Sequence, residues 1–515
     1  MGFWSIPFTG DQKLYVSVAR EMLEQNSWLK PYLWGESYYN KPPFLYWTLL
    51  TSWKVFGLNL WATYLPSLIA LVMSSYFLGE IAFLLRERRW FLNTGLWFAV
   101  SFGAITYTYA AQMEIWTVLF YAASWWAGLK FLDGEHGKRN LNLLYLAFFV
   151  AGLSALVKSP LYSGFWVLGF FLYLFIAGEW ELFIEKHLYL ALGVGVVCGL
   201  SWYVYILAVD SSRFYDQYVL QETFGKSGGN SSTLVGFWSG LITLSLPTLL
   251  FSFPAIRTLW RERRTDRVGK VVLAWISFPA LFFSIFPYRV HSYLILIVPM
   301  IALTTDWGLF RLAKTSIAKK SLRFAASTVA IACLALAAVL MRSQVSNPWI
   351  TLLWFLSALS MLAFGFTNRI RGVILSLLLI AGLIHASAVQ IGEKDMNDLR
   401  EWLKTQPQST EFFMIDYDKN VWHEATLLEL AIDHRVLRVH SPEAVTQNLD
   451  ARKTLLCSAD DFEKLNLGSS TKTTIWKRLK TKAQLPLKAM FTSSESIYRD
   501  FLIVEAISSL KTQKP

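Results

Sequence analysis

The sequence predicts an α-helical membrane protein that crosses the bilayer many times and carries a small α/β domain at its C-terminal end. Hydrophobic residues make up 54% of the 515 residues and the mean hydropathy is +0.38, whereas soluble domains are about 45–50% apolar. Apolar runs of spanning length recur as far as residue 391. A single soluble core is excluded, because such cores stop growing at about 250–300 residues.

The apolar runs predict about 12 spans, and the connections between them alternate in charge. The spans are expected at 63–85, 89–109, 112–132, 141–157, 160–177, 189–208, 236–256, 271–288, 291–310, 324–342, 349–366 and 373–391. Basic clusters fall in alternate connections, at 86–89, 138–139, 257–270, 311–323 and 369–371. Because cytoplasmic loops are rich in Lys and Arg, the other connections are expected on the periplasmic face of a bacterial inner membrane.

The net charge of +12 supports the same topology. Residues 1–392 contain 30 basic and 18 acidic side chains, whereas residues 393–515 contain 18 of each. The excess therefore marks loop orientation, and we expect no nucleic-acid partner. Cys198 and Cys333 lie in apolar runs and Cys457 stands alone in the tail, so neither a disulfide framework nor a Cys-x-x-Cys metal site is present in the sequence.

The chain begins with a polar stretch at residues 5–60, which the topology places outside. An outer Asp11 requires a span before it, and residues 2–7 are typical of the last turn of a helix. We therefore expect the native protein to have one more N-terminal span before the transmembrane domain, 1–392, and Met1 not to be the true start. Inspecting the codons upstream of Met1 would test this expectation, because an in-frame stop codon immediately before Met1 would contradict it.

The segment 393–515 is predicted to be a small periplasmic α/β domain. Short apolar runs at 411–415, 435–439, 454–457 and 501–504 are typical of buried strands, and helical patterns lie at 424–432 and 441–449. No glycine-rich phosphate loop occurs among them, so a nucleotide site is not expected.

Two carboxylates are candidates for acid–base chemistry. Asp11 follows Gly10 in the outer stretch, where it could accept a proton from a hydroxyl or an amine. The alternative is that it caps the following helix. Glu114 lies at the next outer turn and could face Asp11 as a second acid. Its alternative is a favourable interaction with the helix dipole.

Three cations are candidates for binding a phosphate. Lys41 precedes two prolines that hold it extended among aromatic residues near the lipid–water boundary, although an interfacial lysine can also simply snorkel there. Lys158 lies between two spans and could equally stabilise a helix C-terminus. Arg289, also between spans, has a planar fork that can bond two phosphate oxygens.

The loop at 209–235 carries Arg213, Tyr215, Glu222 and Lys226 and ends in a glycine-rich stretch. It is either a mobile lid or a plain connector. No His/Cys/Asp cluster in the sequence has metal-ligand spacing, and no Ser–His–Asp signature is present. The pattern that remains is two acids and at least three cations at span ends on one side of the membrane.

This arrangement resembles the C-type glycosyltransferases of the protein O-mannosyltransferase and lipid A aminoarabinose transferase superfamily (bacterial family 39/83 type). The matching pieces run in order over about residues 8–300 and include the specific Lys-Pro-Pro block. They are Asp11, Ala19-Arg20-Glu21-Met22-Leu23, Tyr38-Tyr39-Asn40-Lys41-Pro42-Pro43, Tyr46-Trp47, Leu65-Pro66-Ser67, Glu114, and the segments 156–160, 214–224 and 293–299.

The resemblance implies inverting transfer of a sugar from a polyprenyl-phosphate donor to a lipid A, glycan or protein acceptor on the periplasmic face. The donor is a substrate, no cofactor is implied, and dependence on a divalent metal is left open. The implied site comprises catalytic Asp11 and Glu114 and substrate-binding Lys41, Lys158, Arg289, Tyr293, Glu222 and Tyr39.

Three departures from the family pattern accompany the resemblance. Gln12 stands where a second acid usually follows the first, Tyr64 stands where an arginine often precedes Leu-Pro-Ser, and the first span is absent. The rival interpretation is a transporter or lipid flippase, which would predict mid-span charges and related halves. A non-catalytic envelope scaffold is a third alternative, but it leaves the outer cations unexplained.

Overall fold

A computed structural model describes most of residues 11–384 and parts of the C-terminal segment. Within 11–384 the described ranges exclude 34, 87–91, 109–110, 135–137, 226–232, 263–265, 312–314 and 343–347. Beyond them the description covers 386, 402, 405, 411–415, 436–439, 445, 447–449, 453–458, 471–479 and 498–506.

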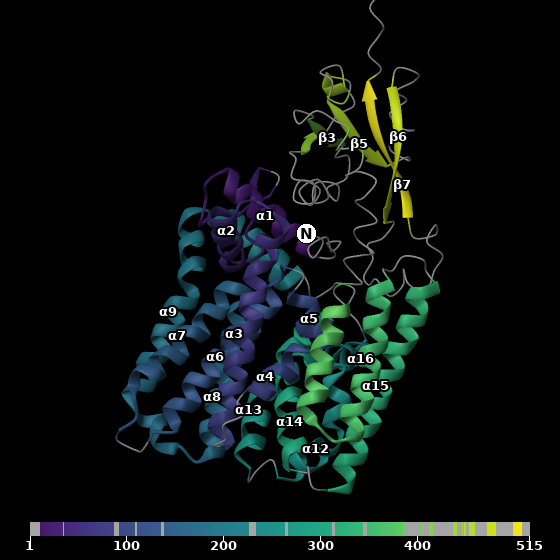
Figure 1. Cartoon of the computed structure of the whole chain (residues 1–515). Coiled ribbons are helices and arrows are strands. Elements are labelled where there is room, and N and C mark those ends of the chain that lie inside the picture. The colour runs from purple at the N-terminus through teal and green to yellow at the C-terminus, as the bar shows by residue number, and fades with distance from the viewer. Residues whose placement is uncertain are drawn as a thin grey trace, which may run out of the picture.

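Long helices form a bundle, and the N-terminal helices and the C-terminal sheet lie at the same end of it (Figure 1). The α-helices are α1 Gln12–Glu24, α2 Phe44–Phe56, α3 Leu60–Arg86, α4 Leu92–Ala99, α5 Phe102–Thr108, α6 Met113–Leu132, α7 Leu141–Val157, α8 Pro160–Ala177, α9 Lys186–Val209, α10 Ser211–Phe214, α11 Leu234–Ser245, α12 Thr248–Glu262, α13 Arg267–Ile285, α14 Val298–Arg311, α15 Ser316–Arg342, α16 Pro348–Phe366 and a further helix, Ile370–Ile384. Shorter helical turns are η1 Trp180–Ile184, the π-helix η2 Tyr215–Phe224 and η4 His291–Leu296.

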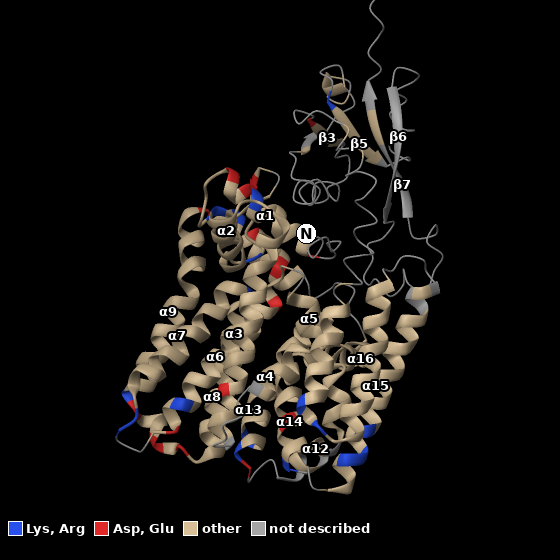
Figure 2. Cartoon of the chain, viewed as in Figure 1, with Lys and Arg blue, Asp and Glu red and all other residues tan. Residues whose placement is uncertain are grey.

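The prediction of a multi-pass membrane protein is confirmed. Among the described residues, 7 helices are long and apolar enough to cross a bilayer. Shorter apolar helices complete the bundle. Many Lys and Arg residues lie at the end of the bundle opposite α1, together with several acids, and acids and bases are also mixed around α1 and α2 (Figure 2). The described parts of the predicted basic connections, such as Arg139, Arg267 and Arg311, lie at this end.

Two of the predicted spans are broken rather than continuous, which corrects the prediction at 89–109 and 236–256. The first is divided into α4 and α5, and the second into α11 and α12. The breaks meet inside the bundle, where the N–H of Phe102 donates to the carbonyl of Leu246 at 2.6 Å. The hydroxyl of Thr248 donates to a carbonyl of α4 at 2.7 Å. Backbone groups freed at each break are thus satisfied within the protein, as an apolar environment requires.

The C-terminal segment forms a mixed five-stranded sheet of order β4-β3-β5-β7-β6. Its strands are β3 Phe412–Ile415, β4 Val436–Val439, β5 Thr454–Ser458, β6 Thr471–Leu479 and β7 Tyr498–Ala506. The strands β4, β3 and β5 are parallel, and β7 runs antiparallel to β5 and β6. All four predicted strands are present; the helical pattern at 424–432 lies outside the described residues. The edge strand β6 was not predicted, because its sequence is rich in Thr, Lys and Arg and contains no long apolar run.

The helix α1 is an amphipathic element that covers the start of α2. It buries Tyr15, Val18 and Met22 at helical spacing. A short hairpin, β1 Tyr32–Leu33 with β2 Glu36–Ser37, then leads to α2. The N-terminus of α1 is joined to α3, because the side-chain amide of Gln12 donates to the hydroxyl of Tyr64 at 3.4 Å. Both side chains are buried, so the two departures from the family pattern contact one another as a neutral pair.

This contact predicts strong coupling between the two positions. Gln12→Glu places an unpaired carboxylate in a buried site and should lower the stability by several kcal/mol, as should the lone cation of Tyr64→Arg. In the double variant the introduced glutamate and arginine can form an ion pair, so much of the lost stability should be recovered. Thermal unfolding of the purified protein in detergent measures the effect.

A control separates charge from the hydrogen bond itself. Tyr64→Phe removes only the neutral hydrogen bond to Gln12 and should cost about 0.5–1.5 kcal/mol. If the destabilisation of the double variant equals the sum of the two single variants, the residues are not coupled.

Candidate functional site

The Lys41 side chain is held by Glu222 of η2. Its ammonium forms an ion pair with the carboxylate, and the two side chains are 12% and 18% exposed. Pro43 stands at the N-cap of α2, and the N–H of Trp47 donates to its carbonyl. The Lys-Pro-Pro block therefore places Lys41 just before a helix start. Two predicted substrate-binding residues, 181 positions apart, are brought into contact.

The same segment is fixed to η2 by a second set of contacts around Tyr39. Its backbone N–H donates to Oε1 of Gln217 at 2.6 Å, and its hydroxyl donates to Asp210 at 3.0 Å. Nε2 of Gln217 in turn donates to the carbonyl of Ser37 at 3.0 Å. The Tyr39 side chain is fully buried, so it holds the loop in place instead of lining an open surface.

These contacts show that the first half of the loop at 209–235 is helical and packed on the outer segment. From the sequence alone, this loop could be either a mobile lid or a plain connector. The π-helix η2 covers residues 215–224, and Arg213 lies 4.0 Å from Glu36. Lys226 and the glycine-rich stretch lie outside the described residues. The π-helical geometry is rare and often occurs at functional sites.

A second ion pair joins Glu114 to Lys158. The Lys158 ammonium lies 2.7 Å from Oε1 of Glu114, and both side chains are at least nine-tenths buried. Glu114 also interacts with Ser292, and the ammonium lies 4.8 Å from the ring centre of Tyr293. The start of α6, the α7–α8 turn and η4 therefore meet at this pair, which combines three predicted site residues.

Lys158 remains charged in this buried setting. Burial works against the ammonium, but the Glu114 carboxylate outweighs it and raises the pKa of Lys158 well above its usual value. Stability that depends on the protonated lysine is thus present below its ordinary pKa and is lost only as the pH rises through the higher value. At neutral pH the pair is an ammonium and a carboxylate.

Asp11 lies at the start of α1 with an exposed side chain. It occupies the N-cap position without a side-chain capping bond, so the structure does not support the helix-cap alternative. Instead its carboxylate accepts from the hydroxyl of Tyr15 at 3.5 Å. Burial, and then the charges of Asp11 and Glu114, raise the pKa of Tyr15. Tyr15 therefore lies within electrostatic range of both predicted acids.

Tyrosines link the two ion pairs and Asp11 into one cluster. Burial, followed by Glu222 and Asp11, raises the pKa of Tyr38. Tyr162 lies within electrostatic range of Lys158, Glu114 and Glu222. Of the residues that complete this cluster, the sequence analysis missed Tyr15, Ser292 and Tyr162. Ser292 is adjacent to the predicted Tyr293, whereas Tyr162 gives no local signal.

Arg289 occupies a different setting from the other predicted cations. Its guanidinium donates to the carbonyls of Phe283 and Ser284 at 3.2 and 3.1 Å, which closes the last turn of α13. It precedes η4 by two residues and so approaches the Lys158 cluster through the backbone of that segment. No three His, Cys, Asp or Glu side chains within the described part of the chain are placed to hold a metal ion.

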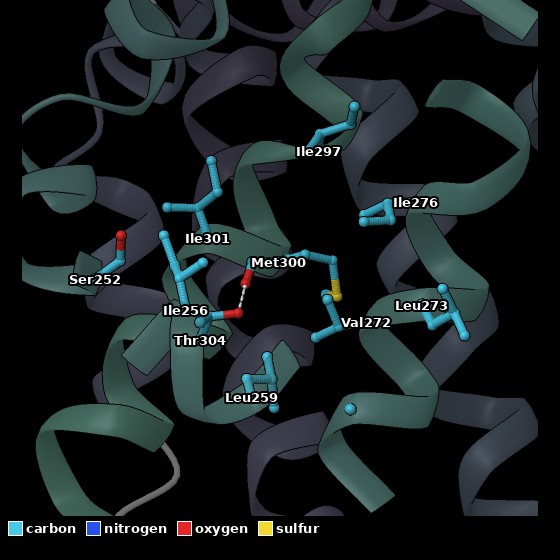
Figure 3. Close-up of a pocket in the computed structure, with 11 residues that line it drawn as sticks. Ser252, Ile256, Leu259, Val272, Leu273, Ile276, Ile297, Met300, Ile301 and Thr304 are labelled. Atoms are coloured by element: carbon cyan, nitrogen blue, oxygen red, sulfur yellow. Dashed lines mark hydrogen bonds between the residues drawn. The ribbon is translucent and has the colours of Figure 1, made fainter. Parts of the chain in front are cut away.

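An apolar cavity of about 190 Å³ lies elsewhere, between α12, α13 and α14 (Figure 3). Ile256, Val272, Met300 and Ile301 line it, and the hydroxyl of Thr304 is directed to the carbonyl of Met300 at 2.7 Å. None of the predicted site residues lines this cavity. Its walls offer packing surface for a hydrocarbon and no acid or cation for chemistry.

Comparison with known proteins agrees with the family that the motifs indicate. The family model for dolichyl-phosphate-mannose–protein mannosyltransferases matches residues 40–205. The chain is 26% identical over 295 residues to undecaprenyl phosphate-alpha-4-amino-4-deoxy-L-arabinose arabinosyl transferase 2 of Sodalis glossinidius, which is 55% of this chain and 52% of that protein. It is 28% identical over 306 residues to the corresponding transferase of Pseudomonas aeruginosa strain LESB58, covering 57% and 53%. The chain thus spans about half the length of these two relatives.

Solved structures establish the fold. The crystal structure of ArnT from Cupriavidus metallidurans bound to undecaprenyl phosphate aligns with a TM-score of 0.71 and 16% identity, covering 98% of this chain and 96% of that one. The apo structure of the same protein aligns with a TM-score of 0.67 and 15% identity, covering 98% and 95%. The chain therefore has the fold of ArnT, and its sequence is similar to C-type glycosyltransferases of the protein O-mannosyltransferase and lipid A aminoarabinose transferase type.

Proposed function

We propose that this protein transfers a sugar from a polyprenyl-phosphate donor to an acceptor on the periplasmic face of the bacterial inner membrane. The observation that carries the proposal is the gathering of Asp11, the Lys41–Glu222 pair and the Glu114–Lys158 pair around shared tyrosines. The cluster lies at the end of the bundle opposite the basic loops (Figure 2). By the positive-inside rule that end faces outward.

The donor is inferred from the cations and from the relatives. Lys41, Lys158 and Arg289 can hold the phosphate of the carrier, because charge-assisted hydrogen bonds to phosphate are strong. The names of the relatives support undecaprenyl phosphate as the carrier and 4-amino-4-deoxy-L-arabinose as the sugar. Among lipid, glycan and protein acceptors we propose lipid A, the acceptor in one branch of the superfamily.

The proposed reaction is a single displacement with inversion. Asp11 accepts the proton of the acceptor hydroxyl as that oxygen forms a bond to the anomeric carbon. The bond between the anomeric carbon and the phosphate oxygen breaks, and polyprenyl phosphate leaves with the bonding electrons. The cations stabilise the negative charge that develops on the leaving group, which is often the largest catalytic contribution.

The role of Glu114 follows from its partner. Its carboxylate is occupied by Lys158 at 2.7 Å, so we propose that it acts by positioning the Lys158 ammonium instead of removing a proton. Tyr293 supports the same ammonium through its ring. Tyr39 holds the segment that carries Lys41, and Glu222 orients that lysine until the donor phosphate replaces it.

The main test is Asp11→Asn in membranes supplied with a lipid-linked sugar donor and lipid A. Transfer should fall by about 10²–10⁴-fold, the usual contribution of a general base. Glu24→Gln is the matched control, since Glu24 is an exposed acid on the same helix that pairs with neighbouring Arg20. Undiminished transfer by the Asp11→Asn variant would remove Asp11 from the mechanism.

The Lys41–Glu222 pair predicts opposite effects of two substitutions. Lys41→Gln should raise the KM for the donor by about tenfold or more, because a charged hydrogen bond contributes about 1.5–3 kcal/mol. Glu222→Gln removes the carboxylate that competes with the phosphate for Lys41, and the donor KM should fall. Steady-state kinetics with varied donor measure both. A rise in KM for the Glu222→Gln variant would contradict the competition.

The Glu114–Lys158 pair predicts a loss of stability that can be separated from catalysis. Lys158→Met leaves a buried carboxylate unpaired and should destabilise the protein by about 3–5 kcal/mol. The double variant Glu114→Gln/Lys158→Met should recover stability but not transfer, if Lys158 contacts the donor phosphate. Unfolding midpoints and transfer rates are measured on the same preparations. A stable double variant with full activity would show that the pair is purely structural.

The transporter alternative makes a different prediction for the purified protein. A flippase moves the lipid-linked sugar without breaking it, whereas the proposed enzyme releases polyprenyl phosphate in proportion to glycosylated acceptor. Chromatography of the carrier after incubation distinguishes the two.

A further inference from the structure

Two buried polar atoms beside the proposed catalytic cluster have no hydrogen-bond partner among the described residues. They are Oδ1 of Asn40 and the hydroxyl of Tyr46. Asn40 directly precedes Lys41 in the chain, and Tyr46 lies in the first turn of α2. Neither residue has a role in the transfer reaction proposed above. A buried polar atom without a partner is costly to a folded protein, so each of the two requires an explanation.

The orientation of the Asn40 side chain is set by Tyr38. Burial raises the pKa of Tyr38, whereas its hydrogen bond with Asn40 works in the opposite direction. A bond that favours the ionised phenol is one in which the phenol oxygen accepts, so the amide nitrogen of Asn40 is the donor. The carbonyl oxygen of the same side chain can accept two hydrogen bonds and receives none from the described residues. It is therefore available to a donor group of a bound molecule.

The Tyr46 hydroxyl belongs to the same cluster. The Tyr46 side chain is fully buried, and its ring centre lies 6.4 Å from that of Tyr15, whose hydroxyl donates to Asp11 at 3.5 Å. The hydroxyl of Tyr46 interacts electrostatically with Tyr38, Glu222 and Asp11. Tyr38 in turn interacts with Glu222 and Asp11. The two tyrosines are thus within electrostatic range of both carboxylates.

The two atoms lie where the proposed reaction requires the sugar of the donor. Lys41 is assigned to the donor phosphate, and Asp11 to the proton of the acceptor hydroxyl. In a displacement with inversion the attacking and leaving oxygens lie on opposite sides of the anomeric carbon. The sugar ring therefore occupies the space between Lys41 and Asp11. Asn40 is the chain neighbour of the first residue, and Tyr46 is within electrostatic range of the second.

We infer that Asn40 and Tyr46 form the subsite that binds the sugar of the lipid-linked donor. The carbonyl oxygen of Asn40 accepts a hydrogen bond from a hydroxyl or amino substituent of the ring, and the Tyr46 hydroxyl bonds to a neighbouring substituent. Displacement of Glu222 from Lys41 by the donor phosphate gives the sugar access to both atoms, because Glu222 lies within electrostatic range of Tyr38 and Tyr46. The subsite rests on the proposed transfer reaction and defines what that reaction recognises on the sugar.

The test combines variants of these two residues with donors that lack one ring substituent. Undecaprenyl-phosphate-linked 4-amino-4-deoxy-L-arabinose is compared with its 2-deoxy and 3-deoxy analogues and with the analogue that lacks the 4-amino group. With the unaltered protein, at least one deletion should lower kcat/KM by about tenfold or more, because it leaves a buried protein group unpaired. In the Asn40→Ala or Tyr46→Phe variant the same deletion should have little further effect, since the protein side of the hydrogen bond is already gone.

Unfolding midpoints separate sugar binding from a structural role. The Tyr46 hydroxyl has no partner in the described part of the chain, so Tyr46→Phe should leave the midpoint unchanged or raised. Tyr121→Phe is the matched control, because the hydroxyl of this buried tyrosine donates to the carbonyl of Trp275 at 3.3 Å. It should lower the midpoint and leave the discrimination among donors unchanged.

A second control matches the asparagine. Asn142→Ala alters an exposed asparagine of α7 and should change neither quantity. If Asn40→Ala fails to fold, Tyr46→Phe decides the matter, because it removes one oxygen and keeps the ring.

Three results would overturn the subsite while leaving the transfer reaction in place. Equal transfer from all four donors by the unaltered protein would show that no ring substituent is bound. Variants that retain the full effect of every deletion would show that other residues bind the sugar. A lower midpoint for Tyr46→Phe with unchanged discrimination would show that its hydroxyl is structural. Absence of transfer from every donor would instead overturn the proposed reaction, and the subsite with it.

Discussion

The buried ion pair between Glu114 and Lys158 is the interaction on which the α1 end of the bundle depends. Two charges in an apolar setting each lose hydration, and only a close partner offsets that loss. The pair accordingly draws together the start of α6, the α7–α8 turn and η4, with the two charged groups 2.7 Å apart. It fixes the position of the Lys158 ammonium, which in the proposed function holds the phosphate of the donor.

The same rule governs the other cations of the cluster. Lys41 is paired with Glu222, and Arg289 is satisfied by carbonyls of α13. Each of these positive groups thus has a protein partner. In the proposed reaction, binding of the donor phosphate would be an exchange of partners, after which the cations contact the leaving group on which negative charge develops. Asp11 differs because its carboxylate is exposed and, within the described residues, contacts a phenol instead of a cation.

The Gln12–Tyr64 contact shows how a departure from a family pattern can be understood in three dimensions. Taken singly, each residue weakens the resemblance, since a charge is expected at both positions. The structure places them 3.4 Å apart and buries both. A neutral pair can occupy a buried site where a single charge could not, so the two substitutions are compatible only together. With Gln12 neutral, Asp11 is the carboxylate at the start of α1 to which we assign the proposed acid–base role.

Local patterns determined the fold class, most helices and four strands, because hydrophobic runs and alternation report directly on burial of neighbouring residues. They also identified the residue types of the candidate site. Tertiary structure decided the partners: Lys41 meets Glu222 across 181 positions and Lys158 meets Glu114 across 44. It also decided the breaks at Phe102 and Leu246, whose backbone groups satisfy each other. Such pairings join segments that are distant in sequence, so the hydrophobic periodicity of a single segment cannot predict them. Only packing of the bundle brings the charges within reach of one another.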